Sequence, residues 1–68
     1  MSVYRVTELI GTSSQSWEDA AGIALTQAQQ TIRDLRVAEV VEQDIAIDED
    51  GSFLYRTKLR VSFKYDAE

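Results

Sequence analysis

The chain of 68 residues contains no cysteine, no histidine and no proline. Without cysteine it can form neither a disulfide nor a thiolate metal site. Without histidine it has no imidazole to act as a general base, a metal ligand or a switch near neutral pH. No nucleophile with a partner base can be assembled from the remaining residues, so the sequence predicts a protein that is not an enzyme.

Basic residues are scarce. Seven lysines and arginines stand against twelve aspartates and glutamates, which gives a net charge of −5. Binding to a phosphate backbone requires a basic surface, so no nucleic-acid partner is expected. No segment approaches the roughly 20 apolar residues of a membrane span, and the N-terminus lacks the order of a signal peptide. The sequence therefore predicts a cytoplasmic protein with no membrane partner.

The chain is also short, which limits it to a single domain over residues 1–68. A chain of this size buries only about 60% of its unfolded surface. Ordering it costs about 1.5 kcal/mol per residue, and small domains usually need disulfides, metals or partner subunits as additional support. Because disulfides are excluded, association with further copies is the expected support.

Four segments of secondary structure can be predicted. A strand is expected over Val3–Ile10, where Tyr4, Val6 and Ile10 share one face. A helix is expected over Trp17–Leu35, since small and apolar residues, mostly alanine, recur in three- and four-residue steps. Ser16 is its expected N-cap, and the arginines near its end suit the helix dipole.

The last two segments form a predicted hairpin of strands Val37–Asp48 and Phe53–Tyr65. Apolar and polar residues alternate strictly along the last strand, and Gly51 supplies the positive φ of a three-residue turn. The turn fixes the pairing as Asp44 with Arg56, Glu42 with Lys58, Ile45 with Tyr55 and Val41 with Leu59, the last two pairs facing the helix. The predicted fold class is α+β, β-α-β-β, a three-stranded antiparallel sheet wrapped on one long helix.

Four stretches together resemble the dodecin family over almost the entire chain. They are YRVTELIGTS at the start, SWEDAAGIALTQA in the helix, AEVVEQ in the second strand and YRTKLRVSFKY at the end. The resemblance implies a hollow homododecamer of β-α-β-β subunits. It also implies storage of a flavin, riboflavin or its phosphate FMN, between subunits, with a stacking tryptophan before AEVV and a glutamine in the last strand.

The sequence departs from this pattern at both flavin positions. Val37 stands where the family has the stacking tryptophan, and Arg56 where it has the glutamine. A valine offers no aromatic plate, and stacking of a ring contributes roughly 1–3 kcal/mol by analogy with nucleobases. Tight flavin binding is therefore predicted to be lost or strongly weakened. The expected register places Val37 and Arg56 on opposite faces, unless a bulge intervenes or the site is shared between subunits.

Three functions remain open. The first is a homododecameric shell that binds or stores a small ligand other than flavin, with a divalent cation, calcium or magnesium, at Glu42. The second is residual flavin storage in a rearranged pocket. The third is a structural assembly module without a ligand.

Overall fold

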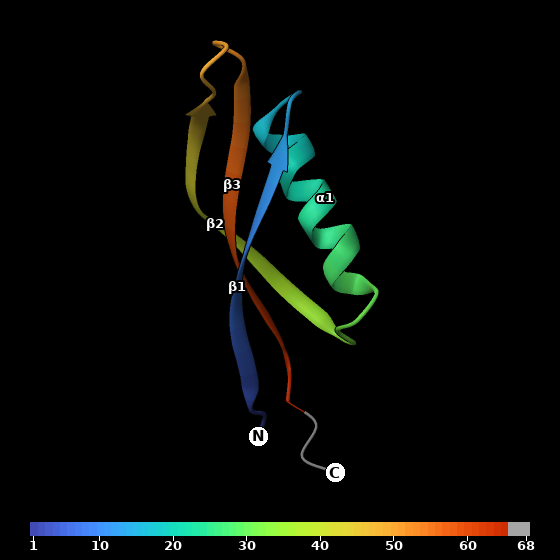
Figure 1. Cartoon of the computed structure of the whole chain (residues 1–68). Helices are drawn as coiled ribbons and strands as arrows, with labels where there is room; N and C mark the ends of the chain where they lie inside the picture. The colour runs from blue at the N-terminus through green and yellow to red at the C-terminus, as the bar shows by residue number, and fades with distance from the viewer. Residues whose placement is uncertain (66–68) are drawn as a thin grey trace.

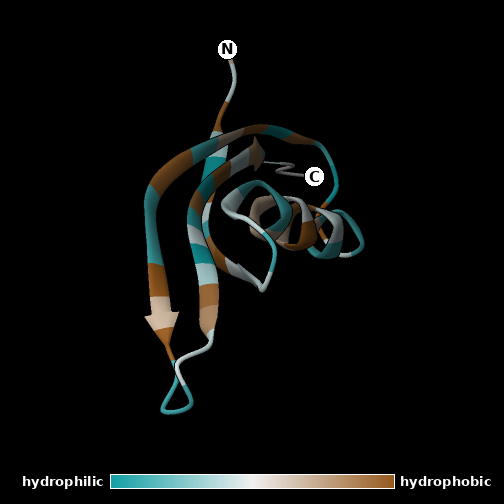
Figure 2. Cartoon of the chain, turned by 90° about the horizontal axis from the view of Figure 1, so that it is seen from above, coloured by the Kyte–Doolittle hydropathy of each residue, from teal (hydrophilic) through white to brown (hydrophobic). Residues whose placement is uncertain are grey.

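The computed structural model describes residues 1–65. The chain runs through β1 (Tyr4–Ser13), α1 (Trp17–Gln29), β2 (Leu35–Ile47) and β3 (Phe53–Lys64). The three strands form one antiparallel sheet in the order β1-β3-β2, and α1 lies against one face of it (Figure 1). Seen from above, the sheet curves around the helix (Figure 2). The predicted fold class is thus confirmed, while residues 66–68 of the predicted domain lie outside the described part.

Close contact between α1 and β1 depends on small residues. Ala20, Ala24 and Ala28 are the buried residues of α1. A Cβ placed on Gly11 would lie 2.0 Å from the carbonyl oxygen of Ala20 and 2.9 Å from the Cβ of Ala24. The helix backbone can therefore approach β1 this closely because the strand carries a glycine there.

The buried core is small. In the described part of the chain its apolar members are Ala20, Ala24, Ala28, Leu59 and Val61. The accessible surface is 5239 Å², against about 4,300 Å² for a compact protein of this mass. The radius of gyration is 14.0 Å, against about 11 Å for a compact chain of this length. The excess surface supports the expectation that other copies cover part of the chain.

The helix ends earlier than predicted, and the prediction of Leu35 as its last residue was wrong. It ends at Gln29, with no basic residue in its last turn. The amides of Thr31 and Ile32 both bond to the Ala28 carbonyl at 3.1 and 2.8 Å, which tightens the final turn. Asp34 then adopts a left-handed conformation with φ 61° and turns the chain into β2. Aspartate tolerates this region better than most residues, so neither glycine nor proline signals the helix end.

The hairpin is formed largely as predicted. The amide of Asp48 donates to the Ser52 carbonyl at 2.9 Å, and Gly51 has φ 87°. Asp44 pairs with Arg56, Glu42 with Lys58 and Ile45 with Tyr55, as expected. The pairing of Val41 with Leu59 was wrong: a bulge between Val40 and Glu42 puts Val40 opposite Leu59. Relative to their predicted limits, β1 starts one residue later and extends to Ser13, β2 starts at Leu35 and stops at Ile47, and β3 stops at Lys64.

The strand β1 turns its more apolar side away from the helix. Tyr4, Val6 and Ile10 are all exposed, whereas Leu9 packs against the core. Registers with β3 place Leu9 opposite the buried Leu59 and Ile10 opposite Lys58. The sheet face away from α1, called the open face below, therefore carries apolar side chains as well as charges. No helix within residues 1–65 is long and apolar enough to cross a membrane.

Candidate ligand-binding face

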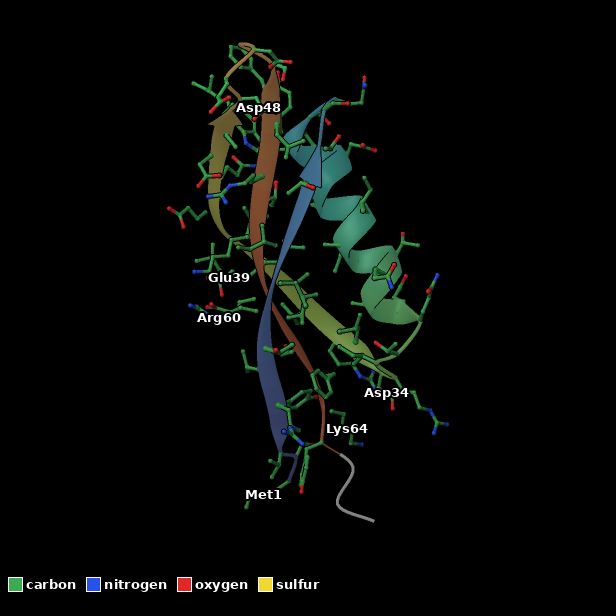
Figure 3. The ribbon with its side chains drawn as sticks, in the orientation of Figure 1. Met1, Asp34, Glu39, Asp48, Arg60 and Lys64 are labelled. Carbon is green, nitrogen blue, oxygen red and sulfur yellow. The ribbon has the colours of Figure 1, made fainter. Side chains whose placement is uncertain are left out.

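Cross-strand pairing arranges the open face in rows, because residues paired across a ladder point to the same side of the sheet. From β1 through β3 to β2, the rows are Thr12, Arg56 and Asp44; Ile10, Lys58 and Glu42; Glu8, Arg60 and Glu39; Val6, Ser62 and Val37. Figure 3 shows Glu39 and Arg60 on the side away from α1. Each of the three basic side chains that these rows place on the central strand thus faces a carboxylate on β2, and Arg60 also faces Glu8 on β1.

The first row contains the shortest of the described ion pairs on this face. Arg56 Nε donates to Asp44 Oδ1 at 2.7 Å, and Arg56 Nη2 donates to Asp44 Oδ2 at 2.8 Å. These hydrogen bonds lower the pKa of the Asp44 carboxyl and raise the pKa of the Arg56 guanidinium. A guanidinium held in this two-pronged way has its preferred carboxylate partner and is less available to a ligand.

A second group of ion pairs surrounds Glu8. Arg60 Nη2 lies 3.0 Å and Lys58 Nζ 3.6 Å from the Glu8 carboxylate. The hydrogen bond from Arg60, followed by the charge of Lys58, lowers the pKa of Glu8. Arg60 also reaches Glu39 at 3.5 Å. Sequence reasoning missed this role of Glu8; the register of β1 on β3 was the signal needed to find it.

Glu42 differs from the other carboxylates of the face. It pairs with Lys58 in the ladder, but the Lys58 ammonium turns to Glu8 instead. Within residues 1–65, Glu42 forms no ion pair, whereas Glu8, Glu39 and Asp44 all do. It lines a shallow pocket of about 190 Å³. The other lining residues of this pocket are Ile10, Asp44, Arg56 and Lys58.

The bulge in β2 resolves where Val37 lies. Because one extra residue is inserted before Glu42, Val37 pairs with Ser62 and falls on the open face together with Arg56. The register without a bulge, which puts the two residues on opposite faces, was therefore wrong, and the alternative in which a bulge intervenes is confirmed. Ser62 lies six positions after Arg56 along β3, which corresponds to about 20 Å at 3.3 Å per residue. Within one chain, Val37 and Arg56 are too far apart to contact the same small ligand.

Trp17 takes a structural position rather than one on the open face. Its indole Nε1 donates to the backbone carbonyl of Asp44 at 3.0 Å, and its ring meets Tyr55 edge-on at 5.3 Å. The Thr57 hydroxyl donates to the Trp17 carbonyl at 2.9 Å. These contacts attach the start of α1 to the β2–β3 hairpin, on the sheet face opposite to the side chains of Asp44 and Arg56.

Residues 1–65 of a single chain do not provide a site for a cation. Among residues 1–65, no three acidic side chains lie close enough together to hold a metal ion. Calcium takes 6–8 oxygen ligands, and the pocket at Glu42 also contains the cations Arg56 and Lys58. The oxygen donors that residues 1–65 bring together at Glu42 do not fit a metal ion by themselves, so a site there would need further oxygens.

A curved antiparallel sheet on one helix, with a charged open face and an undersized core, defines a small α+β protein of β-α-β-β order. The sequence model of the dodecin family matches residues 3–66, and the chain belongs to that family. It is 55% identical over 64 residues to the calcium dodecin of Mycobacterium tuberculosis, covering 94% of this chain and 90% of that protein. It is 39% identical to the dodecin of Thermus thermophilus, covering 94% and 93%.

Solved structures agree with the sequence matches. The crystal structure of the M. tuberculosis calcium dodecin, described as having a novel calcium-binding site, superposes with a TM-score of 0.90 at 51% identity. That match covers 98% of this chain and 96% of the other. The dodecin of Streptomyces coelicolor gives a TM-score of 0.89 at 31% identity, with coverages of 98% and 96%.

Proposed function

We propose that this chain is the subunit of a cytoplasmic homododecameric shell that binds a divalent cation, calcium in preference to magnesium, and catalyses no reaction. The observation that carries the proposal is Glu42, the open-face carboxylate that forms no ion pair within residues 1–65. The 55% identity to a protein named calcium dodecin supports the choice of ion.

Assembly can supply the further oxygen ligands that a cation needs beside Glu42. Symmetry repeats Glu42 and its neighbours once in every copy, so where these residues of two or three copies meet, a site can collect their oxygens. Calcium accepts a larger and more variable set of oxygens than magnesium, which demands near-octahedral geometry and keeps its waters. A site built from exposed, repeated carboxylates therefore favours calcium.

Flavin is the weaker candidate ligand because neither residue at the family's two flavin positions, Val37 and Arg56, suits it. Val37 is 60% exposed and presents no ring for stacking. Arg56 is engaged by both oxygens of Asp44, so it does not replace a neutral glutamine amide. Riboflavin added at low micromolar concentration should keep its fluorescence; stoichiometric quenching would instead support residual flavin storage.

Equilibrium dialysis tests the cation. The assembled protein is stripped with chelator and dialysed against calcium or magnesium, and bound metal is measured per chain. Glu42→Gln should abolish calcium uptake, while the control Glu39→Gln, which removes an ion-paired carboxylate of the same strand, should retain it. Equal calcium uptake by both variants contradicts the assignment of Glu42. An assembled wild type that binds neither metal leaves the structural module as the function.

A further inference from the structure

The turn of the β2–β3 hairpin contains an aspartate followed directly by a glycine, Asp50 and Gly51. None of the other aspartates of the chain precedes a glycine, and the chain has no asparagine. The turn projects at one end of the molecule, and both residues are exposed to solvent (Figure 1). An exposed aspartyl-glycyl bond can rearrange without an enzyme, because glycine has no side chain to shield its amide nitrogen from the neighbouring carboxyl group.

The rearrangement is a loss of water followed by a hydrolysis. The Gly51 amide nitrogen attacks the side-chain carboxyl carbon of Asp50 in its neutral acid form. A C–N bond forms, a C–O bond breaks, and the amide proton leaves with the hydroxyl group as water, which closes a five-membered succinimide ring. Solvent water then opens the ring. Attack at the side-chain carbonyl restores aspartate, and attack at the main-chain carbonyl leaves isoaspartate, so no atom is oxidised or reduced.

In the folded turn both reacting groups are held in hydrogen bonds. The Ser52 amide donates to Asp50 Oδ1 at 2.9 Å, and the Ser52 hydroxyl donates to the same oxygen at 2.7 Å. The Gly51 amide donates to the Asp48 carbonyl at 2.9 Å. The first of these bonds, from a side chain to the amide two residues on, is typical of aspartate in turns. Ring closure consumes the Gly51 amide proton and neutralises the Asp50 carboxylate, so it opposes all three bonds.

The bonds from Ser52 also keep the Asp50 carboxyl group ionised. The amide of Ser52, followed by its hydroxyl, lowers the pKa of Asp50. A carboxylate reacts poorly with a nucleophile, because its charge repels the attacking nitrogen and it has no good leaving group. At a given pH the folded turn therefore contains less of the reactive acid form than the unfolded chain does.

We propose that Asp50 and Gly51 form a site of spontaneous isoaspartate formation and that Ser52 restrains the reaction while the hairpin is folded. The reaction requires neither assembly nor a cation. Isoaspartate adds one carbon atom to the main chain between residues 50 and 51. The turn is closed by the bonds from Gly51 to Asp48 and from Asp48 to Ser52, and the lengthened turn no longer fits both. Formation of isoaspartate thus opens the end of the hairpin.

Ageing of the folded and the unfolded chain tests the site. Wild-type protein is incubated near neutral pH with and without guanidinium chloride and digested with trypsin. Electron-transfer fragmentation of the peptide of residues 37–56 distinguishes isoaspartate from aspartate. Isoaspartate should accumulate at residue 50 in the unfolded chain, and about tenfold or more slowly in the folded protein. An unfolded chain without isoaspartate at residue 50 overturns the site, and equal rates in the two states overturn the restraint.

Variants of Ser52 test the restraint itself. Ser52→Ala removes the hydroxyl bond and should accelerate the reaction in the folded protein about two- to tenfold, as expected for the loss of one hydrogen bond. Ser52→Thr keeps a hydroxyl group and should react at the wild-type rate. The control Ser14→Ala removes an exposed hydroxyl that bonds to the Gln15 side chain, and it should change nothing.

Two results would contradict the role of Ser52. One is an equal rate for Ser52→Ala and Ser14→Ala, with native circular dichroism for both. The other is an acceleration by Ser52→Ala that persists in guanidinium chloride, where the turn is absent.

A variant of Asp50 tests the position of the reaction. Asp50→Glu requires a six-membered ring in place of the five-membered succinimide, so the isomerised peptide should disappear from aged samples. The same amount of isomerised peptide in this variant would come from Asp44 or Asp48 and would overturn the assignment to Asp50.

Discussion

The side chains on the two faces of the sheet make different kinds of interaction. The face under α1 is lined by small and buried side chains in close contact, with Gly11 admitting the helix backbone. The open face consists of exposed charges joined in ion pairs, with apolar side chains of β1 and Val37 beside them. Exposed ion pairs contribute little to stability. The stability of one subunit therefore depends mainly on the helix-covered face, while the open face offers charge and apolar surface to ligands and other copies.

The largest effect should come from the closest contact on the helix-covered face. Gly11→Ala places a methyl carbon where only 2.0 Å separates it from the Ala20 carbonyl oxygen, so the helix must move away. We expect a loss of about 3 kcal/mol or more in the free energy of unfolding, measured by urea denaturation.

The matched control makes the same chemical change on the exposed side of the helix. A Cβ on Gly22 meets nothing within 4 Å. Gly22→Ala should therefore stabilise the protein by about 1 kcal/mol through helix propensity. Equal unfolding midpoints for the two variants would show that the two faces do not differ as described.

A smaller effect is expected at the buried hydroxyl under the hairpin. Thr57 is fully buried and its hydroxyl donates to the Trp17 carbonyl at 2.9 Å. Thr57→Val keeps the shape and removes that bond, so unfolding should become easier by about 1 kcal/mol. Thr26→Val, the same change at an exposed helix position, should leave the midpoint within error; a similar loss there would argue against the buried bond.

The smallest effect should come from the ion pairs of the open face. Hydrogen bonds from arginine lower the pKa of Asp44 and of Glu8 in the folded chain. In the unfolded chain these carboxyls have ordinary pKa values of about 4. As the pH falls, they therefore bind protons in the unfolded chain before they do so in the folded chain. Their contribution is thus present above about pH 4 and disappears as pH falls through the lowered values. The urea concentration at the unfolding midpoint should therefore fall as the pH is lowered. Asp44→Asn should make this fall less steep, whereas the control Glu18→Gln should leave it unchanged.

The elements with strong local signals were predictable. Strict alternation along β3 and the glycine of the turn determine the hairpin, and with it the pairs Asp44–Arg56 and Glu42–Lys58. The helix end was not predictable, because it depends on an aspartate with positive φ rather than on glycine or proline. The bulge before Glu42 leaves no mark in the composition, since Val40 and Val41 are interchangeable by pattern alone.

The sheet face on which Arg56 and Glu42 lie was predictable, but the arrangement of the charged side chains on that face was not. Arg56 and Glu42 were expected on the charged side, where they lie. The placement of Val37 on the same face of the sheet required the bulge. The pairing of Glu8 with Lys58 and Arg60 depends on which neighbour β3 receives on its other edge, a long-range feature that no local pattern encodes.

In the proposed shell, further copies cover surface that one chain leaves exposed. The molar mass in solution, measured by light scattering coupled to native mass spectrometry, tests it most directly. With a chain of 7.7 kDa, the proposed shell of twelve copies predicts about 92 kDa, twelve times the chain mass. A folded species of 7.7 kDa at micromolar concentration would contradict the claim.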